Sequence, residues 1–505
     1  MKRNNLTTAV VAGIAGVAGI ASVSNAVNLN SDGVGQVLVY PYYTVNNGLN
    51  TLISVVNTSD RTKAVKVRFL EGKNSRECLD FNLYLSPYDV WTAGLVAASA
   101  TSLYSPGFEG QDTVKIVTND KSCTDPAVLS GYEFLPWAFV GAAADPVYDP
   151  GGWELERCTE GHFEMIEMGN IDDLTTETGV LHNGGVPNDC GVLTDNWSGA
   201  GTLDWANDEN DGLESPTGGL FGSASIIDVV GGTDVAYNAD AIEGVFVDPA
   251  HTDPGNLQPG LGDGDDNNSY IFANAAVVSD FWMSNPVQAV SAVYMHDQIF
   301  GEYVLSDGIG ANTEWVVTFP TKNYYVDPDR SPFISVPYEP FTEEIGEYGA
   351  CEVYTIALYD REEQTPDPRL VIRPPSPRPP TVTNDDAVFC WETNVLEFED
   401  SDRVSGESMV LGSRNTTHYA TQSVPAQPAT PQTPAVEAEY FTTGWVALSF
   451  AQSTDDNLND RTYGGLPVTG FAIQRYVNGN ASEGLLANYA GLFAHRYSRD
   501  IVSGP

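Results

Sequence analysis

The segment between residues 53 and 72 constrains the fold of this chain more than any other stretch of its sequence. Within it, KAVKVRFLEG (63–72) alternates Val and Phe with Lys and Arg after a cluster of turn-forming residues. Successive side chains of a β-strand point to opposite faces of a sheet, so this alternation predicts a strand with one apolar face. We expect Phe69 to be buried, and Lys66 and Arg68 to be exposed on the solvent face of an antiparallel sheet.

The same strand pattern recurs along much of the chain. Apolar or alternating runs bounded by turn residues occupy 35–45, 50–59, 77–95, 112–118, 268–284, 288–300 and 313–327. In the run at 77–95 the alternation predicts a buried Leu83 and an exposed Asn82. The best helical patterns are short, at 157–168 and 236–243. These features predict an all-β protein made of antiparallel β-sandwich modules of the immunoglobulin-like kind.

Residues 1–26 have the pattern of a secretory signal peptide. Lys2 and Arg3 precede an apolar stretch, and small residues stand at the −3 and −1 positions of a cleavage site after Ala26. A membrane anchor is the alternative, although the apolar stretch is short for a span of about 20 residues. We expect export to the periplasm, the cell surface or the medium, and no transmembrane segment in the mature chain.

The remainder is expected to form two β-rich modules and one insertion. Residues 27–140 and 267–344 are assigned to a first sandwich, and 345–505 to a second module with Pro-rich spacers. The segment 141–266 has 26 acidic residues against one basic residue, and its apolar runs are brief. It is interpreted as an acidic, loop-rich insertion, and loops of such length are usually functional or disordered.

Six cysteines suit an exported chain, because disulfides persist in oxidising compartments. They are Cys78, Cys123, Cys158, Cys190, Cys351 and Cys390. At least two intramolecular disulfides are predicted, and the simplest pairing joins sequence neighbours, including Cys158 to Cys190. The alternative for these two cysteines is a zinc site with His162 and His182, although the spacing matches no usual zinc motif.

The balance of charge limits the class of partner. The chain has 68 acidic against 23 basic residues, a formal net charge of −45 at pH 7. Such a surface repels nucleic acid, so an unknown surface or extracellular molecule is the expected partner. The acidity suits salty or calcium-rich surroundings, or it reflects only the habitat of the source.

One acidic loop has the residue types of a calcium site. In GDGDDNN (262–268), Asp263, Asp265 and Asn267 offer oxygen ligands at alternate positions. The EF-hand pattern fails, since Asn268 stands where Gly is required and Asn274 where the bidentate Glu should be. A flexible acidic turn is the alternative, and calcium is the only cofactor predicted.

Catalytic motifs are missing from the sequence, which has no G-x-S-x-G, no H-E-x-x-H and no Walker loop. Paired carboxylates such as Glu164 and Glu167 could serve a glycosidase. In so acidic a chain they arise equally well as a solvated face, here of the helix expected at 157–168. No catalytic residue is therefore assigned.

Five blocks of the sequence have distinctive wording: GQVLVYPYYTV (35–45), most of 50–72, DFNLYLSPYDVWTA (80–93), WVVTFPTK (315–322) and GLPVTGF (465–471). They resemble a family of uncharacterised exported or cell-surface proteins of Gram-negative bacteria. The resemblance implies export and a β-rich fold, and it brings no catalytic motif.

Together these features favour a non-enzymatic exported surface or periplasmic protein with a structural, adhesive or binding role. A secreted hydrolase acting on polysaccharide is one alternative, which catalytic groups gathered in a cleft would support. An assembly or chaperone-like module is another, which a long unpaired sheet edge would support.

Overall fold

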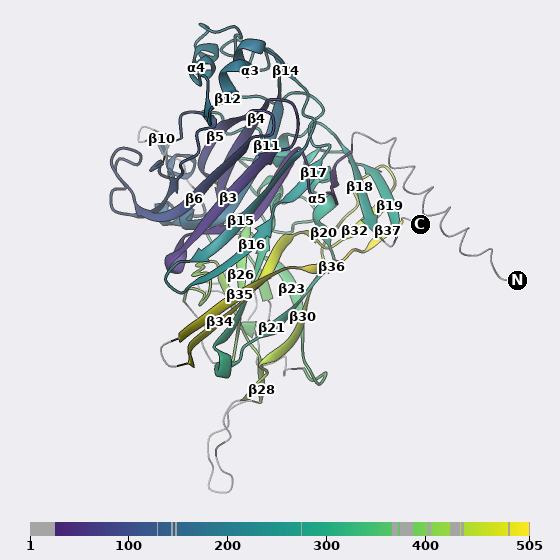
Figure 1. The fold of residues 1–505 in the computed structure, drawn as a ribbon. Coiled ribbons are helices and arrows are strands. Elements are labelled where there is room, and N and C mark those ends of the chain that lie inside the picture. The colour runs from purple at the N-terminus through teal and green to yellow at the C-terminus, as the bar shows by residue number, and fades with distance from the viewer. Residues whose placement is uncertain are drawn as a thin grey trace, which may run out of the picture.

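The computed structural model describes residues 26–503, apart from 129, 143–144, 147–148, 274, 366–371, 374–386, 401–405, 425–434, 436–438 and 483–484. The predicted signal peptide, except Ala26, and the Pro-rich spacers lie outside the described residues. Strands hold 47% of the residues and helices 10%, which confirms the all-β prediction. In the described part of the chain, no helix is long and apolar enough to span a bilayer. Four larger sheets form two pairs, one above the other in Figure 1.

The first pair of sheets comes from the N-terminal half of the chain. Sheet 1 has the order β1-β17-β2-β11-β4-β5-β8, with β14 paired to β11. Its strands are β1 (Asn28–Leu29), β2 (Val37–Thr44), β4 (Lys63–Glu71), β5 (Glu77–Leu85), β8 (Cys123–Asp125), β11 (Glu160–Ile171), β14 (Leu213–Glu214) and β17 (Asp240–Glu243). Sheet 2 has the order β16-β15-β3-β6-β7. Its strands are β3 (Leu49–Asn57), β6 (Val90–Ser99), β7 (Asp112–Val117), β15 (Leu220–Asp228) and β16 (Thr233–Asn238).

The second pair comes from the C-terminal half. Sheet 3 has the order β25-β23-β30-β21-β36, and sheet 4 the order β24-β27-β26-β22-β34-β35, in which only β26 and β27 are parallel. The strands of sheet 3 are β21 (Gln298–Val304), β23 (Glu352–Asp360), β25 (Ala387–Phe389), β30 (Thr443–Phe450) and β36 (Arg496–Ser498). Those of sheet 4 are β22 (Ala311–Thr318), β24 (Ile372–Arg373), β26 (Thr393–Glu399), β27 (Thr416–Ala420), β34 (Thr469–Ser482) and β35 (Leu485–Ala494).

Short elements connect and cover these sheets. The helices are α2 (Trp137–Val140), α3 (Leu174–Val180), α4 (Gly191–Trp197), α5 (Val287–Tyr294) and α6 (Asn323–Val326), with 3₁₀ turns η1 (Asn46–Gly48), η2 (Leu155–Thr159), η3 (Leu261–Asp263) and η4 (Asp307–Ile309). The short strands are β9 (Gly141–Ala142), β10 (Asp145–Pro146), β12 (His182–Asn183), β13 (Val186–Pro187), β18 (Asn268–Ala273), β19 (Ala276–Phe281), β20 (Met295–His296), β28 (Gln422–Val424), β29 (Glu439–Tyr440), β31 (Ser453–Thr454), β32 (Arg461–Gly464), β33 (Leu466–Pro467) and β37 (Ile501–Ser503).

One continuous apolar core joins the two pairs of sheets. Inward-facing side chains of sheets 1 and 2, Phe69 and Leu83 among them, are fully buried, as the alternation predicts. The same core includes Val316 and Phe471 from sheet 4, so the second pair packs directly against the first. Sheets 3 and 4 enclose a further core of their own. The two halves therefore share buried surface.

The predicted exposure of Lys66, Arg68 and Asn82 is wrong, because all three are buried. Alternation places them on the outer face of sheet 1, but that face is covered. Helix α5 and the segment after β17 pack on one part of it, and α3 and α4 on another. The polar side chains between these clusters bind one another or the covering loop, as when the Asn82 amide donates to the Thr252 carbonyl at 2.9 Å.

The segment 141–266 differs most from its expected structure. It supplies β11, which lies between β2 and β4 in sheet 1, and β15, which lies between β3 and β16 in sheet 2. The segment is therefore part of the first pair of sheets rather than a loop-rich insertion. The helices expected at 157–168 and 236–243 are wrong for the same reason, since both stretches contribute strands. The strands β21 and β22, expected in the first sandwich, belong to the second pair.

Candidate functional site: a cleft between the two pairs of sheets

A cleft with a volume of about 300 Å³ lies where the two halves meet. The turn after β4 and the turn η2 form one wall, and β25, β26, β27 and the segment before β23 form the other. Charged groups of both signs, aromatic rings, amides and hydroxyls line it, including Lys73, Glu154, Glu156, Glu160, Glu347, Arg414, Tyr348, Trp391, Asn394, Asn415, Thr416 and Thr417.

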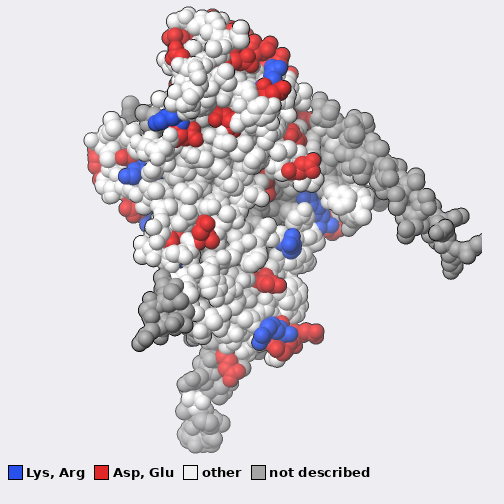
Figure 2. Space-filling model, in the orientation of Figure 1, with Lys and Arg blue, Asp and Glu red and all other residues white. Residues whose placement is uncertain are grey.

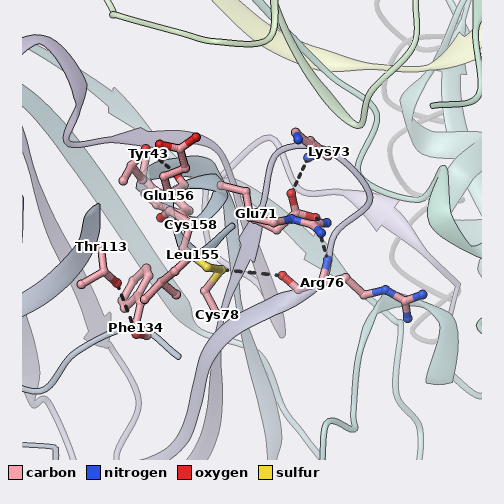
Figure 3. Close-up of a disulfide and its surroundings, with 12 residues drawn as sticks. Tyr43, Glu71, Lys73, Arg76, Cys78, Thr113, Phe134, Leu155, Glu156 and Cys158 are labelled. Carbon is pink, nitrogen blue, oxygen red and sulfur yellow. Dashed lines mark hydrogen bonds and ion pairs between the residues drawn. A yellow bond between two sulfur atoms is a disulfide. The ribbon is translucent and has the colours of Figure 1, made fainter. Parts of the chain in front are cut away.

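Glu71 organises the turn that forms the first wall (Figure 3). Its carboxylate accepts hydrogen bonds from the backbone N–H groups of Lys73, Asn74 and Arg76 at 2.7, 2.9 and 3.1 Å. The Arg157 guanidinium lies 2.8 Å from the same carboxylate. Burial alone would raise the pKa of Glu71, but Arg157 and the backbone donors lower it to about 2. The turn is thus built around a buried carboxylate that stays ionised.

A chain of buried ion pairs runs from this turn into the C-terminal half. Arg157 lies 2.6 Å from Asp149, which lies 2.6 Å from Arg76. Arg76 in turn lies 3.1 Å from Asp327, the residue after α6. Removing one member of such a chain would leave a buried charge unpaired. The chain therefore fixes the first wall of the cleft relative to the second half of the protein.

Backbone hydrogen bonds join the two walls directly. The N–H groups of Glu392 and Thr393, at the start of β26, donate to the carbonyls of Lys73 and Gly72 at 3.1 and 2.8 Å. The Ser75 hydroxyl donates to Glu392 at 2.6 Å. Burial raises the pKa of Glu392 to about 8. The turn after β4 is thus hydrogen-bonded to the start of β26, and the cleft lies beside this contact.

The disulfide between Cys78 and Cys158 holds the base of the same turn (Figure 3). The Tyr43 hydroxyl donates to the Cys158 carbonyl at 3.0 Å, which places η2 against β2. The other two bridges are Cys123–Cys190 and Cys351–Cys390. All six cysteines are paired, which confirms the prediction of at least two disulfides.

Only the Cys351–Cys390 bridge follows the predicted pairing of sequence neighbours, and a Cys158–Cys190 bridge is wrong. The reason is the position of β11, which brings Cys158 beside β5 rather than beside α4. The zinc hypothesis is wrong as well, because both of its sulfurs are bound to other cysteines. His162 is buried in β11, where burial lowers its pKa to about 3.

The cations of the cleft are already in contact with neighbouring groups. The Lys73 ammonium lies 5.6 Å from the centre of the Trp391 ring and donates to the Gly151 carbonyl at 2.7 Å. Arg414 lies 3.2 Å from Glu156 and 3.1 Å from Glu407. These contacts hold the charged side chains in place and leave ring, amide and hydroxyl groups to meet a ligand.

Glu160 lies at the cleft and is buried. The Tyr42 hydroxyl and the Arg414 backbone N–H donate to its two oxygens, each at 2.8 Å. Burial raises its pKa in spite of these donors. A pKa raised by burial is one property of a general acid.

The proposed calcium ligands are placed outside the cleft. Asp263 accepts hydrogen bonds from the Gly260 N–H at 2.8 Å and the Gln258 amide at 2.9 Å. Asp265 accepts from the backbone of the segment after β17, and the Asn267 amide donates to the Trp282 carbonyl at 2.7 Å. Each side chain thus supports its own loop. Calcium binding here stays a prediction.

Glu164 and Glu167 lie on a strand rather than on a helix. Glu164 pairs with Arg68 at 2.8 Å and Glu167 with Lys63 at 2.6 Å, all four side chains being buried. They are therefore not the solvated acidic face that was the alternative interpretation. Both belong to the covered face of sheet 1 and neither lines the cleft.

Sequence reasoning missed a cluster of Glu397, Glu399 and His418 on sheet 4. In this cluster one ligand atom from each residue lies within 4.8 Å of the others, and no other such group of His, Cys, Asp or Glu occurs in the described part of the chain. His418 Nδ1 lies 2.8 Å from Glu399 and 3.1 Å from Glu397. Burial lowers the pKa of His418, but the two carboxylates raise it to about 9. The arrangement serves as a buried ion pair and has ligand types that suit a metal ion. The Glu-x-Glu pattern in β26 was the available signal.

No protein-family model matches this chain, and no curated protein or solved structure does so either.

Proposed function

We propose that the chain is an exported, non-enzymatic binding protein of the periplasm or cell surface, and that its ligand site is the cleft between the two pairs of sheets. The signal-like residues 1–26 and the three disulfides support export. The resemblance to exported proteins of Gram-negative bacteria supports it too. In this proposal the two sheet pairs act as sandwich modules of the immunoglobulin-like kind that hold the cleft between them.

The lining of a cross-linked cleft is the observation on which this proposal rests. A disulfide, a chain of buried ion pairs and backbone hydrogen bonds hold its walls, so a ligand meets a preformed surface. Trp391 and Tyr348 offer ring faces, while Asn415 and two threonines offer hydrogen bonds. This combination suits a ligand with both an apolar face and many hydroxyl groups. An oligosaccharide is the ligand class that fits this description.

Binding is tested with the full disulfide-bonded protein on an array of neutral and acidic oligosaccharides, followed by calorimetry with one that binds. Trp391→Ala should weaken binding roughly tenfold or more, as truncating an aromatic anchor commonly does. Trp445→Ala is the matched control, because Trp445 is exposed on β30, outside the cleft lining. Equal affinity of both variants and the wild type would exclude the cleft, and an array without any binding would exclude oligosaccharides.

A polysaccharide hydrolase remains the second candidate, and Glu160 is the residue that favours it. Its raised pKa would suit a general acid, but both of its oxygens already accept hydrogen bonds from the protein. Incubation of the bound oligosaccharide with wild type and Glu160→Gln separates the two functions. A binding protein returns the sugar intact in both cases, whereas a hydrolase produces new reducing ends that depend on Glu160.

A further inference from the structure

A second pocket, with a volume of about 550 Å³, lies over the outer face of sheet 1 and shares no lining residue with the cleft. Strands β5 and β8 form its floor, and α2, α4 and the loop 253–257 form its walls. The disulfide Cys123–Cys190 ties α4 to β8, so one wall is covalently held beside the floor. The pocket is therefore a built feature of the fold rather than a gap between mobile loops.

Four carboxylates line this pocket, namely Glu77, Asp80, Asp125 and Asp253, and no described Lys or Arg is among its lining residues. Lys66 lies behind Asp80 at 3.1 Å, and Arg68 lies 2.6 Å from one oxygen of Glu77 while it also binds Glu164. Asp125 makes no side-chain hydrogen bond or ion pair within the described residues. Negative charge in the pocket thus exceeds the positive charge around it.

One buried carboxylate oxygen among the lining residues lacks a hydrogen-bond partner. The Glu77 side chain is 2% exposed, and its Oε2 atom has no hydrogen-bond partner in the described structure. Arg330 is 4.0 Å from that oxygen, at the limit of an ion pair. A buried carboxylate oxygen without a donor is costly. Burial and the nearby charge of Asp253 raise the pKa of Asp125.

The remaining lining is apolar and aromatic. Tyr132 and Trp137 offer ring faces, and Trp137 is 41% exposed. Leu79, Leu135 and Leu257 add aliphatic surface. Aromatic faces attract cations, and aliphatic surface favours a hydrocarbon chain. The pocket thus combines the two features that an organic cation needs.

A single metal ion fits this pocket poorly. In the described chain, only the cluster on sheet 4 brings three ligand atoms within 4.8 Å of one another, so three of the pocket carboxylates do not converge on one point. An extended molecule with ammonium groups on an alkyl chain can reach separated carboxylates. We propose that this pocket binds an alkylammonium ligand, with its ammonium groups on Asp125, Asp253 and Asp80 and its chain against Trp137 and the leucines.

Calorimetry of the full disulfide-bonded protein with pentane-1,5-diamine tests this proposal at fixed ionic strength. Saturable binding at one site is expected, and Asp125→Asn/Asp253→Asn should weaken it roughly ten- to hundredfold, as the loss of charge-assisted hydrogen bonds does. Because those two carboxylates repel each other, the double variant should fold normally, which thermal melting checks. Trp137→Leu should lower affinity by roughly two- to fivefold.

Two controls separate a site from general attraction to an acidic protein. Asp234→Asn removes an exposed charge on β16 and should leave diamine binding unchanged. Magnesium chloride, with the same charge as the diamine, should not displace it at equal concentration. Equal affinity of the wild type and the double variant, or equal displacement by magnesium, would overturn the proposal.

The source of the ammonium group is decided with a short lysine-containing peptide and its acetylated form. Binding of the peptide but not of its acetylated form would indicate a lysine side chain of a protein partner. Binding of the diamine alone would indicate a free amine. If neither the diamine nor the peptide binds, the proposal is wrong.

Discussion

Two buried glutamates that each contact an arginine have opposite pKa shifts, and the difference lies in their other partners. Glu71 binds Arg157 and also accepts three backbone N–H groups, and its pKa is lowered to about 2 against the effect of burial. Glu164 has Arg68 as its main partner, but Arg68 is shared with Glu77, and burial raises the pKa of Glu164 to about 7. Contact with an arginine therefore does not by itself keep a buried carboxylate ionised.

Replacement of Arg68 should destabilise the protein as strongly as replacement of a large core residue. Arg68→Ala leaves Glu77 and Glu164 buried without their cation, which should cost about 3–5 kcal/mol at pH 8. Phe69→Ala on the opposite face should cost about 3–5 kcal/mol through the cavity it leaves. Urea unfolding measures both. A cost within about 0.5 kcal/mol for Arg68→Ala, as for an exposed side chain, would contradict its burial.

Glu71 should support the cleft wall only where it is ionised. Its folded pKa of about 2 lies below the ordinary value of 4.5, so its stabilisation is complete above pH 4.5 and is lost as the pH falls toward 2. Glu71→Gln should therefore cost about 3 kcal/mol at pH 7 and clearly less at pH 3.5. Unfolding of both proteins at the two pH values measures this, with Glu109→Gln, an exposed carboxylate, as the control. A pH-independent difference would show that the loss is steric.

At the scale of elements, β4 and β11 explain why basic residues gather near residue 65 of so acidic a chain. Their register places Arg68 opposite Glu164, and Lys63 binds Glu167. The alternation within β4 and β5 correctly predicted which side chains face the core, as the buried Phe69 and Leu83 show. It could not indicate that the second face is covered, because the covering helices α3, α4 and α5 lie more than a hundred residues after β4 in the sequence. The prediction of a helix at 157–168 is wrong for the same reason, because the polar side chains of β11 bind buried charged groups rather than water.

The pair Lys63–Glu167 should be replaceable as a unit but not singly. Lys63→Met leaves Glu167 buried with an unpaired charge and should cost about 3–5 kcal/mol. Lys63→Met/Glu167→Gln removes both charges and keeps one of the two oxygens that accept the N–H groups of Thr217 and Gly218. The double variant should recover part of the lost stability, as chemical denaturation can show. If the loss of stability in the double variant equals the sum of the losses in Lys63→Met and Glu167→Gln, the two charges are not coupled.

The cleft could not be predicted from the sequence, because its walls come from segments that are far apart in the chain. Its walls join the turn after β4 to the start of β26, more than three hundred residues later. The cysteine count predicted disulfides, but only the order of strands in sheet 1 determines that Cys78 meets Cys158. Many strands and their inward faces followed from local pattern, although the run expected as a strand at 288–300 is mostly the helix α5. Sheet order and the cleft follow from contacts between distant segments.

At the scale of the whole molecule, acidity extends from the surface into the interior. Figure 2 shows acidic side chains scattered over one face with few basic ones among them. Burial raises the pKa of many carboxyl groups, and five of them reach values near neutral pH: Asp80 about 6, Glu164, Glu243 and Glu314 about 7, and Glu392 about 8. The folded protein therefore binds protons near neutral pH that the unfolded chain releases.

This difference in proton binding sets how the stability of the whole protein should depend on pH. Each of the five carboxyl groups has a folded pKa above its unfolded value, so the free energy of unfolding falls as the pH rises through 6 to 8. His418, with a pKa raised to about 9, acts in the same direction because the folded state keeps its proton. Below pH 6.5, three buried histidines act in the opposite direction, because burial lowers their pKa to about 3 or 4. They are His162, His251 and His495. As the pH falls, these histidines take up protons in the unfolded chain before they do so in the folded protein. This lowers the free energy of unfolding and offsets part of its increase from the carboxyl groups.

We therefore expect the free energy of unfolding to change little between pH 5 and 6.5 and to fall clearly between pH 6.5 and 8. Urea unfolding at pH 5, 6.5 and 8, at constant ionic strength, measures it. Glu392→Gln should flatten the upper part of the curve, because it removes the group with the highest of the five values. Constant ionic strength is essential, since charge repulsion in an acidic protein grows with pH and is screened by salt. A free energy that rises from pH 6.5 to 8 would mean that these carboxyl groups are ionised in the folded protein, and that unseen cations or water solvate them.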